Sequence, residues 1–93
     1  MWQILEVSVT DNIEAKRVVW HSRRGMLELD VLLLPFAQEI YGQLNEDDQA
    51  RYRALLEKED PDLFMWFLEH ITPDDADMER IVNLVLEHAR KPR

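Results

Sequence analysis

The residue types that could do catalytic chemistry are few in this chain, and their spacing builds no known catalytic motif. The sequence has no cysteine, three histidines and two serines, Ser8 and Ser22. The lack of cysteine excludes disulfides, thiolate zinc sites and cysteine nucleophiles. Two isolated glycines cannot build a phosphate-binding loop, and so few serines do not favour a Ser-His-acid triad. We therefore expect that the chain is not an enzyme.

The histidines also lack the spacing of a metal site. His70 and His88 each follow a glutamate directly, and neighbouring residues on a helix point in different directions. No Glu-x-x-His or His-x-x-x-His pair occurs, although helical bundles use such pairs to hold metals. We expect no metal site.

Charge is distributed unevenly along the chain. The formal net charge is −8, yet residues 16–24 carry Lys16, Arg17, Arg23 and Arg24 and no acid. Residues 25–50 carry acids and no Lys or Arg, and so do residues 60–79. A surface this acidic repels phosphate backbones, so the expected partners include no nucleic acid and no anionic membrane. The chain is a mostly acidic domain with one basic spot.

No segment predicts membrane insertion or export. The longest apolar run, "VLLLPFA", is far shorter than the ~20 residues of a membrane span. The first ten residues, "MWQILEVSVT", lack the basic start and cleavage site of a signal peptide. We expect a cytoplasmic, bacterial protein.

The second half of the chain predicts three helices that begin at recognisable caps. The expected N-caps are Asn45, Asp60 and Thr72, and a proline follows the last two at the first helical position. Apolar residues at helical spacing then predict the core-facing stripes. They are Tyr52, Leu55 and Leu56, then Leu63, Phe64, Phe67, Leu68 and Ile71, and finally Met78, Ile81, Val82, Val85 and Ala89.

The first half predicts two further helices with less regular patterns. Residues 11–24 favour a helix capped by Asp11 or Asn12, and residues 26–44 favour a helix that is apolar on most sides. Pro35 would kink or divide the second of these. The alternative is a buried strand over residues 29–36, paired with residues 2–10. We prefer an all-α fold, a small five-helix bundle in a single domain over residues 11–93, with residues 1–10 as an arm.

Gly25 separates the basic spot from this apolar helix. As the residue after a helix it would adopt the left-handed conformation. A glycine there would also let the backbone of a partner approach closely. Trp20 would share one helix face with Arg17 and Arg24, and Arg24 could pair with Glu28 or present the opposite charge to a partner.

Three segments of the sequence resemble the SdhE family, also called succinate dehydrogenase assembly factor 2. They are "RRGMLELD", "LLLPFAQEIY" and "YRALLEKEDPDLFMWFLEH", and the similarity covers roughly residues 12–90. The Arg-Gly-x-x-Glu signature of the family corresponds to residues 24–28. An acidic-Pro-Asp-Leu-Phe-x-Trp segment corresponds to residues 60–66. The two segments stand at the distance typical of the family, which makes the resemblance specific.

The resemblance implies a five-helix bundle that assists covalent attachment of FAD to the flavoprotein subunit of succinate dehydrogenase, and often of fumarate reductase. The flavin is joined to a histidine of that client, so the chain would need no cofactor of its own, and direct binding of FAD stays open. A monomer is expected. The residues expected to contact the client are Trp20, Arg23, Arg24, Gly25, Met26, Glu28, Asp30 and Trp66. The alternative is an acidic antitoxin-like or regulatory protein-interaction module.

Overall fold

The computed structural model describes residues 13–91, which form five α-helices and no strand. The first helix is described over residues 13–22. It is followed by α2 (Leu27–Glu39), a short 3-10 helix η1 (Tyr41–Gln43), α3 (Glu46–Leu56), α4 (Asp60–Phe67) and α5 (Ala76–Arg90). The all-α fold is confirmed. The strand considered over residues 29–36 is wrong, because these residues lie within α2.

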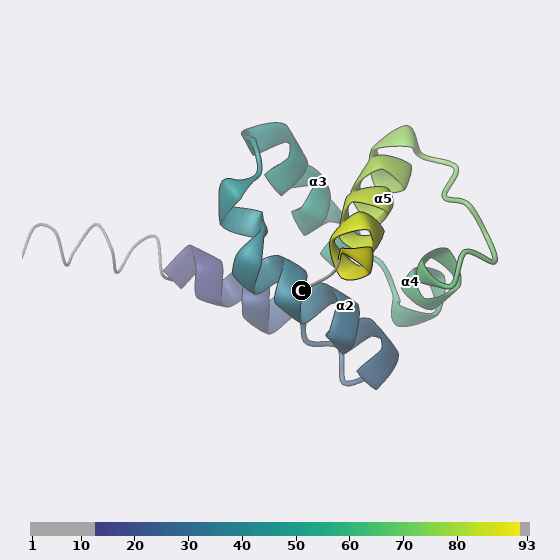
Figure 1. Cartoon of the computed structure of the whole chain (residues 1–93), viewed down its shortest axis with the longest axis horizontal. Coiled ribbons are helices and arrows are strands. Elements are labelled where there is room, and N and C mark those ends of the chain that lie inside the picture. Colours follow the sequence, from purple (N-terminus) through teal and green to yellow (C-terminus); the bar gives the residue numbers. More distant parts are fainter. Residues whose placement is uncertain (1–12, 92–93) are drawn as a thin grey trace, which may run out of the picture.

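Helix α5 lies at the centre of the contacts among the later helices (Figure 1). It packs against α2, α3 and α4, and α2 also packs against α4. The largest wholly enclosed side chains come from α2, α3, α4 and α5, and the first helix adds Val18 to the same core. None of the helices in the described range is both long and apolar enough to cross a membrane.

Helix α2 is continuous through Pro35. A proline inside a helix removes one backbone bond, so the carbonyl of Val31 lacks its usual donor four residues later. One face of α2 is buried through Leu29, Leu33, Phe36 and Ala37. The helix is apolar on most sides, as its sequence indicates, but it is fully buried on that face alone.

The helix starts agree with the predicted caps in one case of three. Asn45 caps α3, and its Oδ1 accepts the backbone N–H of Asp48 at 2.7 Å. Helix α4 is capped by Glu59, one residue before the expected Asp60. Helix α5 is capped by Asp75 instead of Thr72, because Pro73 is buried in the connection and Asp75 accepts from the N–H of Asp77.

The predicted core stripe of α4 is too long. The helix ends at Phe67, and Glu69 adopts a positive φ of 62° that turns the chain away. Leu68 and Ile71 are therefore exposed, and Phe64 is half-buried. Trp66, in contrast, packs against the core. The stripe of α5 is confirmed except for Ala89, which is exposed near the end of the helix.

Two expectations fall on residues outside the described range. They are the arm at residues 1–10 and the capping of the first helix by Asp11 or Asn12.

Candidate partner-binding site

The connection between the first helix and α2 is a sharp corner at Gly25. Its φ is +80°, in the left-handed region that other residues rarely adopt, which confirms the expected conformation. The helix ends at Ser22, however, so Gly25 stands in the connection instead of directly after the helix. A Cβ at this position would meet nothing within 4 Å. Glycine is required here by backbone conformation, and the space beside it is open.

Arg24 points into the molecule and joins three segments. Its Nε donates to Asp60 Oδ1 at 2.7 Å, at the start of α4. Its Nη1 donates to the carbonyl of Leu56 at 2.9 Å, and its Nη2 to the carbonyl of Lys58 at 2.8 Å. Carbonyls at a helix C-terminus need such donors, and the guanidinium supplies several at once. Because only 13% of its side chain is exposed, Arg24 is a structural clamp.

The start of α2 holds the corner from the other side. The backbone N–H of Arg24 donates to Asp30 Oδ1 at 2.8 Å, and the N–H of Asp30 donates to the carbonyl of Met26 at 2.8 Å. Met26 is half-buried against the core. These bonds fix the path of residues 24–30, so the corner is a defined surface.

A buried hydrogen bond anchors the end of the first helix. Ser22 Oγ donates to the carbonyl of Val18 at 2.7 Å and also bonds Tyr52 Oη at 2.7 Å. Ser22 and Tyr52 are both fully enclosed. Burial raises the pKa of Tyr52 well above its usual range, against the opposing effect of its hydrogen bond with Ser22. Sequence reasoning missed this pair, because nothing in the pattern links two residues thirty positions apart.

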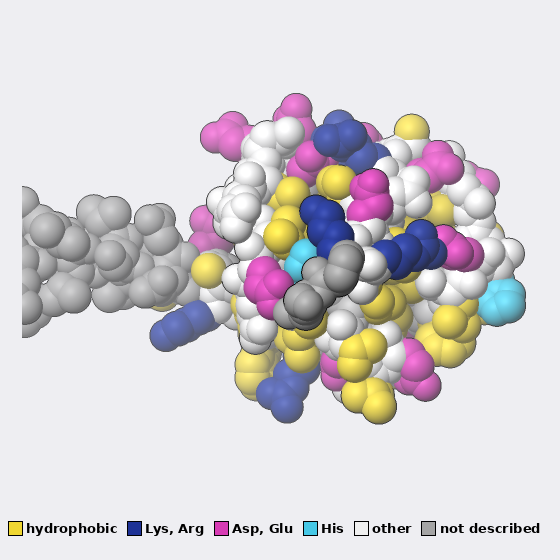
Figure 2. Space-filling model, in the orientation of Figure 1, with side chains coloured by type: hydrophobic (Ala, Val, Ile, Leu, Met, Phe, Trp, Pro, Cys, Tyr) yellow, Lys and Arg dark blue, Asp and Glu magenta, His cyan; other side chains and the backbone are white. Residues whose placement is uncertain are grey.

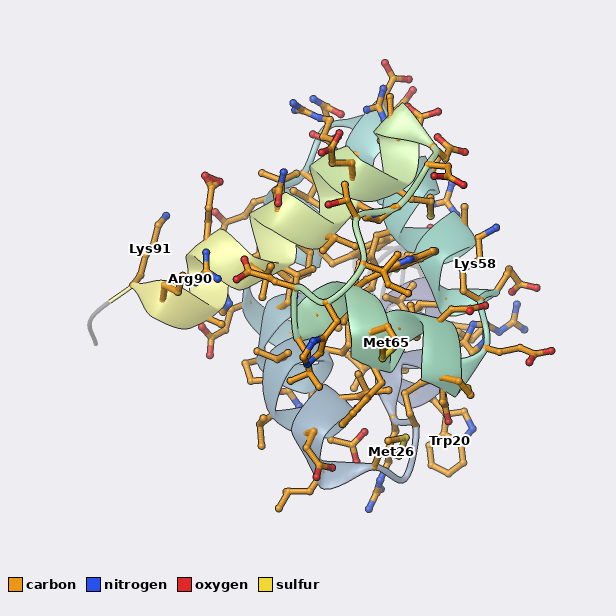
Figure 3. All side chains as sticks on the ribbon, turned by 90° about the vertical axis from the view of Figure 1, so that its right-hand side faces the viewer. Trp20, Met26, Lys58, Met65, Arg90 and Lys91 are labelled. Carbon is orange, nitrogen blue, oxygen red and sulfur yellow. The ribbon has the colours of Figure 1, made fainter. Side chains whose placement is uncertain are left out.

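The remaining expected contact residues differ in exposure. Arg23 and Glu28 are exposed at the corner, and the Trp20 side chain projects into solvent (Figure 3). Arg24 does not share a helix face with Trp20, because the helix ends before it, and it pairs with Asp60 instead of Glu28.

Trp66 belongs to a different part of the surface from the corner. It lines a depression between α4 and α5 with Pro73 and Val82. Of the expected contact residues, the structure therefore brings together those of residues 20–30 and leaves Trp66 apart.

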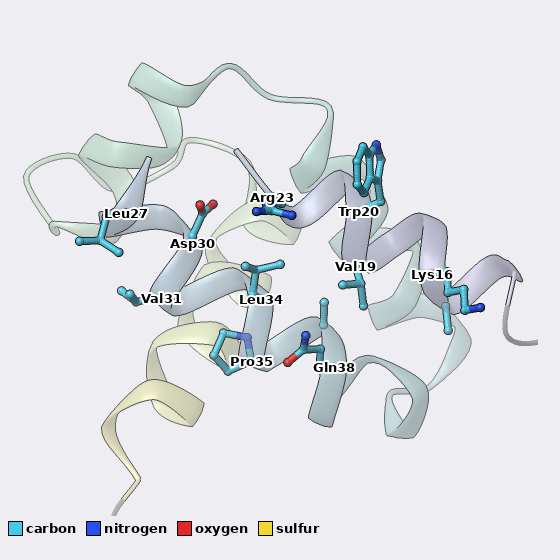
Figure 4. Close-up of a pocket in the computed structure, with 12 residues that line it drawn as sticks. Lys16, Val19, Trp20, Arg23, Leu27, Asp30, Val31, Leu34, Pro35 and Gln38 are labelled. Carbon is cyan, nitrogen blue, oxygen red and sulfur yellow. The ribbon is translucent and has the colours of Figure 1, made fainter. Parts of the chain in front are cut away.

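A groove of about 960 Å³ runs beside the corner, between the first helix and α2 (Figure 4). Val19 and Leu34 lie between the two helices, and Trp20, Arg23 and Leu27 line the groove along its length (Figure 4). Two of these lining residues, Trp20 and Arg23, are among the expected contact residues, as is Asp30. The groove and the corner form one continuous surface.

Neither a metal-binding cluster nor a shifted ionisable group lies at the corner in the described part of the chain. No group of three or more His, Cys, Asp or Glu side chains is placed to hold a metal ion within residues 13–91. Away from Tyr52, the clearly shifted pKa values belong to Asp48, Arg51 and Arg80, which join α3 to α5. The unusual ionisable groups therefore serve the fold.

Comparison with known proteins identifies the family to which the chain belongs. The model of the family described as flavinator of succinate dehydrogenase matches residues 16–89. The chain is 55% identical to the FAD assembly factor SdhE of Pseudomonas aeruginosa over 82 residues, 88% of this chain and 98% of that protein. It is 48% identical to the SdhE of Pseudomonas putida over the same shares of both chains.

A more distant relative supports the same assignment. The FAD assembly factor SdhE of Colwellia psychrerythraea is 41% identical over 78 residues, 84% of this chain and 86% of that protein. These matches favour the flavinylation reading over the antitoxin-like alternative. The chain belongs to the family of flavinators of succinate dehydrogenase.

Proposed function

We propose that this protein is an assembly factor that promotes covalent attachment of FAD to the flavoprotein subunit of succinate dehydrogenase. The supporting observation is the corner at Gly25. Residues 24–28, the Arg-Gly-x-x-Glu segment, form this corner, with Gly25 at a φ of +80° and the N–H of Arg24 bonded to Asp30. The protein acts as a binding partner of its client and supplies no catalytic group.

The residues of the signature and their neighbours have different roles at the corner. Arg24 and Asp30 hold the backbone of the corner in place. The exposed Arg23 and Glu28, together with the open space at Gly25, face the client. The covalent bond forms between the flavin and a histidine of the client. What this chain contributes is a rigid surface that favours the client conformation in which that bond forms.

The proposal extends to Met26, Trp20 and Trp66. Met26 supports the corner from beneath, and Trp20 extends the contact along the first helix. Trp66 would contact the client only if the interface reaches the junction of α4 and α5. Substituting Trp66 tests whether it does.

Several further properties belong to the same proposal. The protein works as a monomer in the cytoplasm, where the client matures, and it serves fumarate reductase as a second client. FAD belongs to the client, and the protein holds no cofactor of its own. Isothermal titration with free FAD, which should give no heat of binding, tests this last point.

The test of the proposal is covalent flavin on the client. In cells that lack their own factor, in-gel fluorescence of the succinate dehydrogenase flavoprotein should appear with this protein and disappear with Gly25→Arg. The variant should stay folded, because a side chain at Gly25 meets open space and left-handed backbone costs about 1–2 kcal/mol.

Gly25→Ala is the matched control. It carries the same backbone strain without the bulk, so it should retain flavinylation. Normal covalent flavin with Gly25→Arg as the sole source would overturn the proposal.

A further inference from the structure

The groove between the first helix and α2 exposes large apolar side chains that the fold leaves uncovered. Trp20 is 74% exposed, Leu27 74% and Val31 56%. All three line the groove, with Leu34 and Pro35 between them (Figure 4). Apolar side chains gathered in this way on a small protein mark an interaction surface. A tryptophan at such a place is the residue type most enriched among binding hot spots.

The same groove carries cations that no internal acid neutralises. Each arginine of α3 and α5 forms an ion pair with a carboxylate. Figure 2 shows Lys and Arg side chains beside Asp and Glu side chains over the face of the molecule that carries α5. Lys16 and Arg23 line the groove, and neither forms an ion pair with any residue of the described range. On a chain of net charge −8, these two charges are left for a partner.

The other polar side chains of the groove are those of Asp30 and Gln38, so two cations stand against one acid. Asp30 is the one acid among the lining residues, and its Oδ1 is engaged by the N–H of Arg24. The carbonyl of Val31 lacks its helical donor because Pro35 has no N–H. The groove thus offers apolar contacts and two cations that have no ion-pair partner among residues 13–91, against the single acid Asp30.

We propose that this groove receives an acidic, amphipathic segment of the flavoprotein client. Apolar side chains of that segment contact Trp20, Leu27 and Val31, and its carboxylates face Lys16 and Arg23. The inference rests on the proposed function, and it adds the chemistry of the client segment and the second half of the interface. Continuity supports this occupant, since Arg23 and Asp30 belong to both corner and groove.

Charge argues against a second copy of the chain as the occupant. In a symmetric dimer the same patch meets itself, which would bring Lys16 and Arg23 of both copies together.

The apolar part of the proposal is tested by affinity for the purified flavoprotein subunit. Trp20→Ser in the full chain should weaken binding about thirtyfold, as expected for an anchor residue. The control is Leu68→Ser, which removes an exposed apolar side chain, at 47%, that lines neither the groove nor the depression at Trp66. The control should bind within about twofold of the wild type, because isolated exposed residues contribute little.

The charged part is tested by reversing the free cations. Lys16→Glu with Arg23→Glu should slow association about tenfold at low salt and flatten its dependence on salt. The control is Lys91→Glu, an exposed cation on the opposite side of the molecule from Trp20 (Figure 3). It should leave the association rate within about twofold.

The outcomes separate this inference from the proposed function. If the groove variants bind the flavoprotein as the wild type does, while Gly25→Arg loses both binding and covalent flavin, the groove is not part of the interface and the function stands. If the wild type itself yields no covalent flavin, the function fails.

A dimeric wild type that Trp20→Ser converts to a monomer would place a second copy in the groove and overturn the inference. Sedimentation at micromolar concentration measures this.

Discussion

Two neighbouring arginines in this protein have opposite roles, although only one residue boundary separates them: Arg24 begins the signature and Arg23 precedes it. Arg24 lies inside and donates hydrogen bonds to Asp60 and to carbonyls at the end of α3, whereas Arg23 is exposed. A signature residue can therefore contribute to partner binding indirectly, by fixing the backbone that the partner contacts. The arginine free to meet a client is the one beside the signature.

The difference predicts opposite effects on stability. Arg24→Ala should lower the free energy of unfolding by about 2 kcal/mol, because the carbonyls of Leu56 and Lys58 lose a charged donor and Asp60 loses its cation. For a domain of this size that is a fall in Tm of about 10 °C. Arg23→Ala should stay within about 0.5 kcal/mol of the wild type. Urea unfolding followed by circular dichroism measures both, and equal losses for the two variants would contradict the assignment.

At the scale of elements, the sequence predicted the helices better than their ends. Local chemistry settled the cap of α3, because Asn45 is the one good capping residue ahead of three acids. The sequence predicted Thr72 as the cap of α5, but Asp75 is the cap, because Pro73 is buried in the connection before the helix, which is a tertiary contact. The predicted α4 was too long. The left-handed turn that follows it is at Glu69, and a turn of this kind is recognisable in a sequence mainly when the residue is glycine.

The candidate site was predictable to the same extent. The Gly25 corner follows from the sequence, because a glycine between a basic segment and an apolar run indicates a turn. The Arg24 side chain points inward because it pairs with Asp60, thirty-six residues away, and a contact between such distant residues cannot be predicted from local sequence. The groove was equally hidden, since the apolar residues of α2 predict burial until the positions of the neighbouring helices are known.

Helices α3 and α5 are joined by one carboxylate whose behaviour predicts a dependence on pH. Arg80 donates to both oxygens of the buried Asp48, at 2.7 and 2.9 Å, and Arg51 donates to Oδ1 at 2.8 Å. The hydrogen bond from Arg80 is the main cause that lowers the pKa of Asp48 from 3.8 to about 2, against the cost of burial. In the unfolded chain the carboxyl takes up its proton at a higher pH than in the folded protein.

The stabilisation by Asp48 is therefore complete above about pH 4 and is lost as the pH falls towards 2. The free energy of unfolding, measured from pH 6 down to pH 2, should decrease between about pH 4 and pH 2, and the decrease should be smaller in Asp48→Asn. Asp47→Asn, an exposed neighbour in the same first turn, should keep the slope of the wild type. An unchanged slope in Asp48→Asn would mean that other groups govern the acid transition.

At the scale of the whole molecule, the binding surface and the core use different parts of the same bundle. The corner and groove lie on the first helix and α2, while α5 supplies core residues and none of the residues that line the groove. Helix α5 nevertheless packs on α2, α3 and α4, so the groove can keep its shape only while α5 is in place. Function should thus depend on α5 through folding alone.

Ile81→Ala tests this dependence. The side chain is fully enclosed on α5, and its truncation should cost about 3 kcal/mol, a large part of the 5–15 kcal/mol that holds a domain together. Because α5 contacts three other helices, helicity and tryptophan fluorescence should melt together, more than about 10 °C below the wild type. Covalent flavin on the client should form normally at low growth temperature and fail when the temperature approaches the lowered Tm. Asn83→Ala, an exposed change on the same helix, should alter neither Tm nor flavinylation. Loss of flavinylation by Ile81→Ala at a temperature where the variant is fully folded would show instead that α5 takes part in recognising the client.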